Sequence, residues 1–293
     1  MRTYLDCIPC LCRQALDAAR FATDDESIHA RVLRRALAAA GEMDMRLSPP
    51  AMAQQMHHVI AELTGARDPY AAIKSQCNRR ALELYPELSR RIAAADDQLA
   101  AGVRMAIAGN IIDFGAASYV DEGTVTRTIE EAWNAPLLGS SVDELRDALA
   151  GARDVLYLGD NAGEIVFDRL LIEQLPAARM TYVVKVGPII NDVTRVDAES
   201  VGLTDIVEVI DNGSDAPGTI LDTCSEAFRR RFAAADLIIS KGQGNYEGLS
   251  DSAGDIFFLL KVKCQVIARH LGCELGSLVL KRSSHGGGAT PGE

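Results

Sequence analysis

Short apolar runs alternate with helix-like segments throughout the second half of this chain, and few architectures accept such an alternation. The runs are DVLYL at 154–158, MTYVVKV at 180–186, DIVEVI at 205–210 and DLIIS at 236–240. Near-continuous apolar strands are typical of parallel sheets, because helices cover both of their faces. We therefore predict an α/β fold with a mainly parallel sheet. DIFFLL at 255–260 or SLVLK at 277–281 is a weaker candidate for a further strand.

The first ~115 residues instead show the apolar spacing of helices, with no obvious strand. In SPPAMAQQMHHVIAELTG, Ser48 is the expected N-cap, Pro49 lies in the first turn and Gly65 ends the helix. We predict a helical N-terminal domain over 1–135 and an α/β domain over 136–282. The Gly-rich end, 283–293, is predicted to be a disordered tail.

Charge and cysteine content restrict the class of protein. The net charge of −11 argues against nucleic acid or an anionic membrane as a partner, since both require a basic surface. The chain contains no run of ~18 apolar residues, so we expect no membrane span, and its start lacks the apolar core of a signal peptide. We expect a cytoplasmic protein whose seven cysteines are thiols or metal ligands. A small anionic substrate would need a local cationic site. The sequence leaves the oligomeric state open.

Polar loops follow three of the predicted strands. They are GDNAGE at 159–164, GPIIND at 187–192 and KGQGNYE at 241–247. Ligands of open parallel sheets bind beyond the carboxyl ends of the strands, so these loops are expected at one edge. Asp160, Asn161 and Asp192 offer hard oxygen donors, which suit Mg²⁺ or Mn²⁺ better than zinc. Any one such loop, taken alone, is more often an ordinary turn or N-cap. The three together favour a binding site.

The same loops offer groups that suit an anionic substrate. Gly163 and Glu164 lie where a helix should begin, and backbone N–H groups with the helix dipole favour a phosphate there. Lys241 would supply a cation on the far side. Asn245 and Tyr246 could hydrogen-bond substrate hydroxyls. The loops lack the glycine spacing of a dinucleotide-binding fingerprint and a Walker lysine.

Further candidates lie outside these loops. Asn110 shares an apolar helix stripe and Asp113 follows it, so this helix could either close the site or merely carry polar residues near its end. Lys263 begins a predicted helix after an apolar run. It is either a solvated strand end or a second ligand for the anion. The C-x-x-C-x-C cluster of Cys7, Cys10 and Cys12 could be half of a metal site, although packing is the commoner role.

The motifs taken together resemble the metal-dependent damage-control phosphatases, long described as domain of unknown function 89 and labelled acidic-residue-methyltransferase-like. The resemblance rests on DNAGE, IINDVT, KGQGNYE, LKVKC, DPYAAIK and AGNIIDFG, in the family's order. The N-terminal Cys7-x-x-Cys10-x-x-Arg13 resembles the mostly prokaryotic subgroup. The eukaryotic subgroup carries Arg-Thr-x-Lys where this chain has residues 260–263. Only the lysine, Lys263, is retained, so the family's sugar-phosphate preferences are left open here.

The resemblance implies a Rossmann-like α/β/α domain on which the helical part packs. It also implies a divalent ion, with Mn, Mg, Co or Ni as candidates, held by Asp160, Asn161 and Asp192. The implied substrate-binding residues are Lys241, Asn245 and Tyr246, with Asn110 and Asp113 nearby. Lys263 is implied as a phosphate ligand.

The main functional hypothesis is metal-dependent hydrolysis of a small phosphomonoester, such as a sugar phosphate or a damaged phosphorylated metabolite. Asp160 or Asp192 would orient or deprotonate the attacking water, or Asp160 would itself be the nucleophile. Lys263 and Lys241 would offset charge on the phosphoryl group. One alternative is an S-adenosylmethionine-dependent carboxyl methyltransferase, which needs no metal. Another is a non-catalytic metabolite-binding protein.

Overall fold

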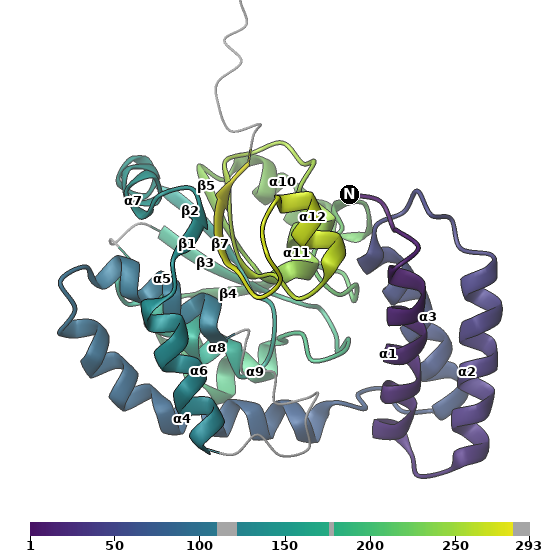
Figure 1. Cartoon of the computed structure of the whole chain (residues 1–293). Coiled ribbons are helices and arrows are strands. Elements are labelled where there is room, and N and C mark those ends of the chain that lie inside the picture. The colour runs from purple at the N-terminus through teal and green to yellow at the C-terminus, as the bar shows by residue number, and fades with distance from the viewer. Residues whose placement is uncertain (110–121, 176–178, 284–293) are drawn as a thin grey trace, which may run out of the picture.

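The computed structural model describes residues 1–109, 122–175 and 179–283, and its strands form one twisted sheet (Figure 1). The strands are β1 (Leu137–Gly139), β2 (Asp154–Leu158), β3 (Arg179–Val184), β4 (Glu208–Asp211), β5 (Leu237–Lys241), β6 (Ile256–Lys261) and β7 (Leu278–Arg282). Their order is β1-β7-β6-β5-β2-β3-β4. Neighbours run parallel except the β6–β7 pair. The mainly parallel sheet is confirmed, and both weaker candidates are strands.

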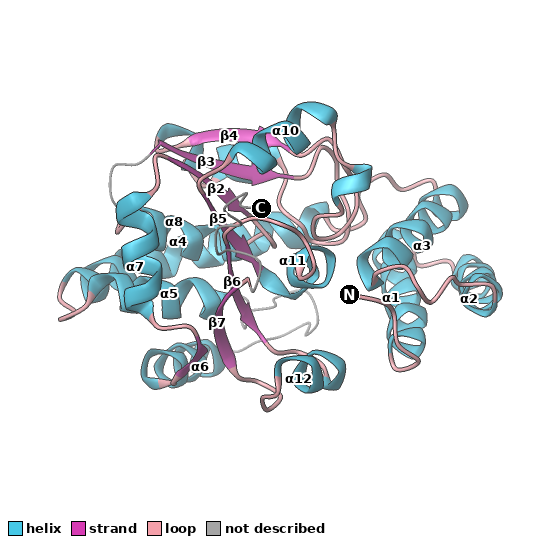
Figure 2. Ribbon diagram, turned by 90° about the horizontal axis from the view of Figure 1, so that it is seen from above, coloured by secondary structure: helices cyan, strands magenta, loops and turns pink. Residues whose placement is uncertain are grey.

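Helices cover both faces of this sheet, which gives an α/β/α sandwich (Figure 2). The helices from residue 71 onward are α4 (Ala71–Ala93), α5 (Gln98–Gly109), α6 (Glu122–Asn134), α7 (Val142–Gly151), α8 (Glu164–Ile172), α9 (Arg195–Ser200), α10 (Glu226–Ala234), α11 (Gly242–Leu249) and α12 (Gln265–Leu271), with short 3-10 turns at Leu203–Asp205 and Leu221–Thr223. One apolar core joins α4, α5 and α8 to the sheet. A second core joins α10, α11 and α12 to the opposite face. The helical layers explain why the strands are apolar on both sides.

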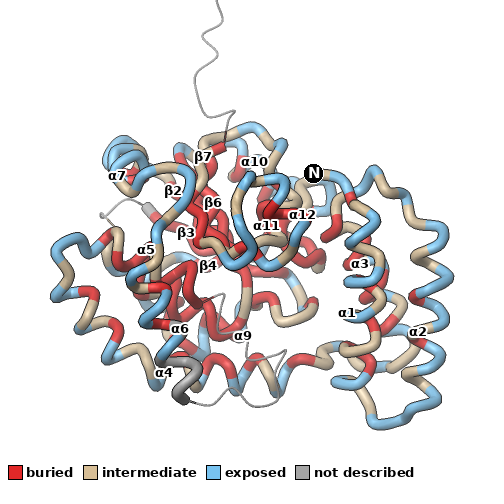
Figure 3. The backbone as a smooth tube through the Cα atoms, in the orientation of Figure 1, coloured by how far each residue is buried: buried red, intermediate tan, exposed pale blue. Residues whose placement is uncertain are grey.

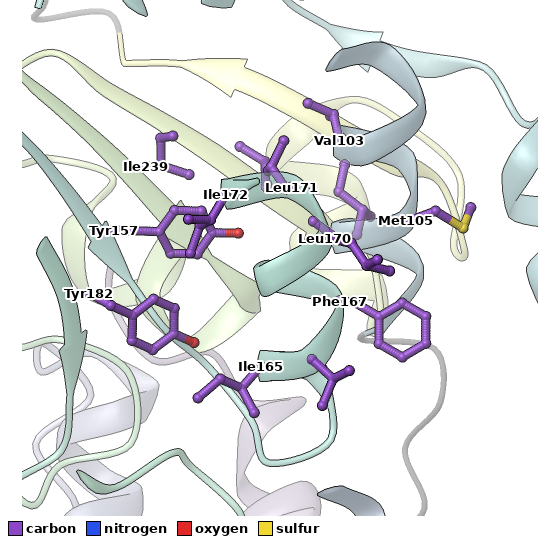
Figure 4. Packing of buried hydrophobic residues seen from close by; sticks show 14 of the residues in the cluster. Val103, Met105, Tyr157, Ile165, Phe167, Leu170, Leu171, Ile172, Tyr182 and Ile239 are labelled. Atoms are coloured by element: carbon purple, nitrogen blue, oxygen red, sulfur yellow. The ribbon is translucent and has the colours of Figure 1, made fainter. Parts of the chain in front are cut away.

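Buried residues are concentrated in the strands and in α8 (Figure 3). The centre of the larger core is the contact between α5 and α8, where Val103 and Met105 of α5 lie close to Phe167 and Leu171 of α8 (Figure 4). The approach of these helices is close enough that a side chain at Gly109 would overlap the ring of Phe167. This packing fixes α8, whose first residues carry part of the candidate site.

The first three helices pack with one another beside the sandwich (Figure 1). They are α1 (Cys7–Ala22), α2 (Glu26–Gly41) and α3 (Pro49–Thr64). Ser48 is the N-cap of α3, and Gly65 ends it in a left-handed conformation, as predicted. This bundle has its own small apolar core, whereas α4 and α5 belong to the core of the sheet. The domain boundary at residue 135 stays a prediction, and the packing groups α4 and α5 with the α/β part.

Two polar contacts fix the bundle against the loop that follows β4. Gln54 Nε2 donates to Asp215 Oδ1 at 2.6 Å, and His58 Nε2 lies 2.8 Å from Asp215 Oδ2. The same loop carries Gly218, which reaches the candidate site. Within the part of the chain that the structure describes, no helix is both long and apolar enough to cross a membrane.

His57 in α3 should make the stability of the protein depend on pH. Its side chain is buried, its Nε2 lacks a hydrogen-bond partner among the described residues, and burial lowers its pKa to about 4. The unfolded chain binds a proton near pH 6.5, whereas the folded chain does not until about pH 4, so stability falls as the pH drops through this window. The expected loss between pH 7.5 and 5 is about 2 kcal/mol.

Urea unfolding of the wild type and of His57→Gln at the two pH values checks this contribution. The glutamine variant lacks the titrating ring, so its stability should fall less on acidification than that of the wild type. Equal losses in the two proteins would assign the acid sensitivity to other groups.

Candidate active site

The loops after four adjacent strands meet at one edge of the sheet. Asp160 follows β2, Asp192 follows β3, Lys241 ends β5 and Lys263 follows β6. These strands are parallel neighbours in the order β3-β2-β5-β6, so their carboxyl ends lie together. The sequence predicted the side chains at each strand end. The strand order places them next to one another.

Asp160, Asn161 and Asp192 come together through backbone pairing of the two loops. Asn161 and Asp192 form an isolated antiparallel bridge, and Val193 N donates to Asp160 O at 2.8 Å. Both carboxylates are buried. Burial raises the pKa of Asp160 well above its usual value, and the neighbouring carboxylates of Glu164 and Asp192 raise it further. Burial likewise raises the pKa of Asp192, to about 6. The carboxylates of Asp160 and Asp192 are therefore shielded from water, and that of Asp160 lies close to other carboxylates.

Lys241 is fully buried beneath these loops and is neutralised by two carboxylates. Its Nζ lies 2.6 Å from Glu164 Oε1 and 2.7 Å from Asp168 Oδ1. Burial alone would lower the pKa of Lys241, but Asp168 and Glu164 hold it above its usual value. The expected contact of Lys241 with a substrate stays a prediction, and the described contacts direct its ammonium to protein carboxylates. Asp168 carried no signal in the sequence, because it resembles one polar position of a helix.

Gly163 is the N-cap of α8, as expected for a helix start, and its N–H group donates to Asn78 Oδ1 at 2.6 Å. Asn78 comes from α4, and its amide nitrogen donates to Asp197 Oδ1 at 3.1 Å. Asp197 in turn pairs with the buried Lys74 at 2.8 Å. The N–H that the sequence offered to a phosphate is therefore bonded within the protein. The family motif DPYAAIK was the only sequence signal for the contribution of α4.

Lys185 and Gly218 are further residues that the sequence reasoning did not single out. Gly218 N donates to Asp192 Oδ2 at 3.1 Å, and Lys185 Nζ lies 3.7 Å from the same oxygen. The Lys185 ammonium also donates to Gly218 O. Lys185 follows directly on β3, within the strand-like run MTYVVKV. Its side chain is buried.

The start of α11 lies directly against Asp160. Gly242 has a φ of +79°, and a side chain there would overlap the Asp160 carboxylate. Asn245 Nδ2 donates to Gly159 O at 3.0 Å and to Lys241 O at 2.8 Å, so it ties α11 to the loop after β2. Its Oδ1 is buried without a partner among the described residues. Tyr246 packs in the second apolar core, the one that contains α10, α11 and α12, with its ring centroid 5.0 Å from that of Phe258.

Lys263 is an exposed cation close enough to Asp160 to act on its carboxylate. Its backbone nitrogen donates to Gln243 Oε1 at 3.1 Å, which links it to the first turn of α11. Its positive charge opposes the rise in the pKa of Asp160, whose main cause is burial. Of the two other predicted positions, Asn110 and Asp113, both lie outside the described residues. The predicted disordered tail also lies outside them, apart from Ser283.

The charges of the buried groups suit a divalent cation. Among the described residues, the site contains the four buried carboxylates Asp160, Glu164, Asp168 and Asp192 and the two buried ammonium groups Lys185 and Lys241. The carboxyl groups thus outnumber the ammonium groups by two, and Asp160, Asn161 and Asp192 offer the oxygen donors that hard divalent ions prefer. No group of three or more His, Cys, Asp or Glu side chains in the described ranges has metal-binding geometry. A metal site here would thus also need the amide oxygen of Asn161.

The N-terminal cysteines lie in α1, and Cys7 and Cys10 are close enough to Glu247 of α11 for its charge to add to the effect of burial on their pKa. All described cysteines are free thiols, and burial raises the pKa of Cys7 and Cys10. Cys264 at the start of α12 contributes to the rise in both.

Comparison with known proteins defines the class. Residues 3–279 match the model of the damage-control phosphatase ARMT1-like domain. A damage-control phosphatase of Archaeoglobus fulgidus is 33% identical over 281 residues, which is 94% of this chain and 97% of the relative. The damage-control phosphatase PH1575 of Pyrococcus horikoshii is 32% identical over 288 residues, which is 97% of this chain and 99% of the relative. The uncharacterized protein MJ0202 of Methanocaldococcus jannaschii is 37% identical over 290 residues, which is 94% of this chain and 93% of the relative.

The fold agrees with these similarities. The crystal structure of a DUF89 family protein, PH1575 of Pyrococcus horikoshii, superposes with a TM-score of 0.89 at 31% identity and covers 97% of this chain and 100% of that one. This chain belongs to the damage-control phosphatase ARMT1-like family. It is a phosphatase of a metal-dependent family, as the sequence predicted. The methyltransferase and non-catalytic alternatives are not favoured.

Proposed function

We propose that this protein hydrolyses small phosphomonoesters, such as sugar phosphates or damaged phosphorylated metabolites, with a divalent ion held by Asp160, Asn161 and Asp192. The observation that supports this most is that buried carboxyl groups outnumber buried ammonium groups by two, at the edge of the sheet where the loops that carry these three residues pair through their backbones. A bound ion would polarise the phosphoryl group and lower the pKa of a water molecule. Mn²⁺, Mg²⁺, Co²⁺ and Ni²⁺ are all compatible with such donors.

The protein's own residues account for the remaining requirements of phosphoryl transfer. Lys263 is exposed and is electrostatically linked to Asp160, so it is placed to pair with phosphoryl oxygens. Its link to Gln243 positions it over the first turn of α11. The carboxylates of Asp160 and Asp192 are the groups available to orient the attacking water and accept its proton. Catalysis of this kind depends mainly on positioning and on charge stabilisation.

The contacts revise the expected contribution of Lys241. A lysine that is held by Glu164 and Asp168 and has no exposed surface would have to break both ion pairs to reach a phosphate. Breaking a buried ion pair costs roughly 3–5 kcal/mol. We therefore assign Lys263 as the cation that pairs with the phosphoryl group. This contact needs only one phosphoryl group, so small substrates without a second anionic group fit the proposal.

The assay that tests this function is phosphate release from a panel of phosphometabolites and an aryl phosphate. Metal-stripped protein should be inactive, and adding one of Mn²⁺, Mg²⁺, Co²⁺ or Ni²⁺ should restore turnover of at least one monoester. Phosphodiesters serve as the matched negative substrates. Undiminished turnover by the stripped protein in the presence of a chelator would reject the metal assignment.

A further inference from the structure

Asp168 lies at the centre of a buried polar cluster beneath the candidate metal ligands. Its Oδ1 accepts hydrogen bonds from Lys241 Nζ at 2.7 Å and from Tyr157 OH at 2.8 Å, and its Oδ2 accepts one from Tyr182 OH at 2.7 Å. The two rings stack at 5.3 Å and come from β2 and β3 (Figure 4). Asp168, Lys241 and both tyrosines are fully buried. Sheet and helix layer are thus joined by one carboxylate.

A continuous series of hydrogen bonds leads from this cluster to Asn161. Lys241 Nζ donates to Glu164 Oε1 at 2.6 Å. The other oxygen of this carboxylate, Oε2, accepts from Asn161 Nδ2 at 3.2 Å, and the same nitrogen donates to Asp160 Oδ2 at 2.8 Å. An amide nitrogen has two hydrogens, and both are thereby directed at carboxylates. The amide oxygen of Asn161 takes no part in these two contacts, and it is the atom that the proposed ion would use.

A buried cluster of this kind adds little net stability to a core. A buried lysine between two carboxylates loses its hydration, and apolar residues of the same volume often stabilise a fold as well or better. A fully bonded polar network does, however, hold each of its members in one orientation. In this protein the member at the end of the network is an amide whose orientation decides whether it offers an oxygen or a nitrogen.

We propose that Asp168 is a positioning residue that acts through Lys241 and Glu164 to fix the Asn161 amide, and thereby sets the affinity of the site for its divalent ion. The proposal rests on the metal assignment of the proposed function. It gives Lys241 and Glu164 a positioning role in place of the substrate contact expected from the sequence. Tyr157 and Tyr182 hold the Asp168 carboxylate in the orientation that Lys241 requires.

Calorimetric titration of Mn²⁺ into metal-free protein, without substrate, tests the proposal. Asp168→Asn keeps the shape of the side chain and removes its charge. Loss of a group that bonds a metal ligand directly typically costs roughly 10- to 100-fold in affinity. Asp168 acts through Lys241 and Glu164, so we expect a weakening near the lower end of that range, about 10-fold. Tyr182→Phe removes one hydrogen bond and should weaken binding less. It also keeps the test decisive if Asp168→Asn fails to fold. At saturating Mn²⁺, turnover of an aryl phosphate should largely recover in both variants.

Asp255→Asn is the matched control. It removes a partly buried ion pair with Arg282, at 2.6 Å and 2.7 Å, at the amino end of β6 and away from the site. It should lower the melting temperature and leave Mn²⁺ affinity unchanged. Folded Asp168→Asn and Tyr182→Phe proteins that bind Mn²⁺ like the wild type would overturn the positioning role alone. A wild-type protein that binds no divalent ion would overturn the metal assignment, and the positioning role with it.

Discussion

Asp192→Asn should eliminate metal-dependent phosphatase activity while the protein still folds. The asparagine retains an oxygen that can accept the hydrogen bond from Gly218, so the loop geometry survives. It removes one of the carboxylates on which the proposed ion depends and leaves the Lys185 ammonium without its neighbouring charge. We expect a loss of Mn²⁺ affinity beyond the roughly 100-fold typical of residues one shell further out. Activity against an aryl phosphate and calorimetric binding of Mn²⁺ are the two measurements.

Asp211→Asn is the control for this substitution. Asp211 ends β4 at the same edge of the sheet, but its side chain is exposed and bonds only the nearby Gly213 N among the contacts described. Its removal changes the net charge by the same amount and should leave both measurements unaltered. If Asp192→Asn retained wild-type turnover and Mn²⁺ affinity, Asp192 would have no place in the mechanism.

Gly242→Ala should also cause a large loss of phosphatase activity. It strains the backbone at the start of α11 and crowds the Asp160 carboxylate. The position has a φ of +79°, and a non-glycine residue in such a conformation costs of order 1–3 kcal/mol. The added methyl group would also overlap the Asp160 carboxylate. Either this carboxylate or the start of α11 would then have to shift. Because a displacement of about 1 Å can cost roughly 100-fold in rate, we expect at least that loss in kcat/KM.

Gly187→Ala provides the comparison in a neighbouring loop. It lies after β3, lacks a positive φ, and a side chain there would meet no atom within 4 Å. Its turnover and thermal stability should match those of the wild type. A Gly242→Ala protein with normal kinetics would show that Asp160 tolerates displacement and does not need its observed position.

The loops of the candidate site could be predicted from the sequence because each lies at the end of an apolar run. Asp160 and Asp192 are polar residues where a buried strand must stop, and parallel strands bring such ends to one edge. The partners of the side chains could not be predicted in this way. Lys241 resembled a substrate cation, and only the packing of α8 against the sheet brings Glu164 and Asp168 within 2.7 Å of its ammonium.

Residues contributed by distant segments escaped prediction for the same reason. Asn78 bonds Gly163 across 85 positions of the chain, and Lys185 is buried by a loop that returns from beyond β4. Apolar periodicity describes the two faces of a single element. It contains no information on which element lies against a given face, or on the direction in which a long side chain leaves it.

The amino-acid sequence by itself determined the class of fold, the sites where strands end, the hard oxygen donors at those ends and the resemblance to a phosphatase family. These are local properties, set by apolar spacing, glycine placement and residue chemistry. Only the tertiary structure decided that Lys263 is exposed while Lys241 is enclosed. The burial of a charge depends on packing between segments far apart in the chain, and the carboxylates that compensate Lys241 come from a helix whose position is set by the whole core.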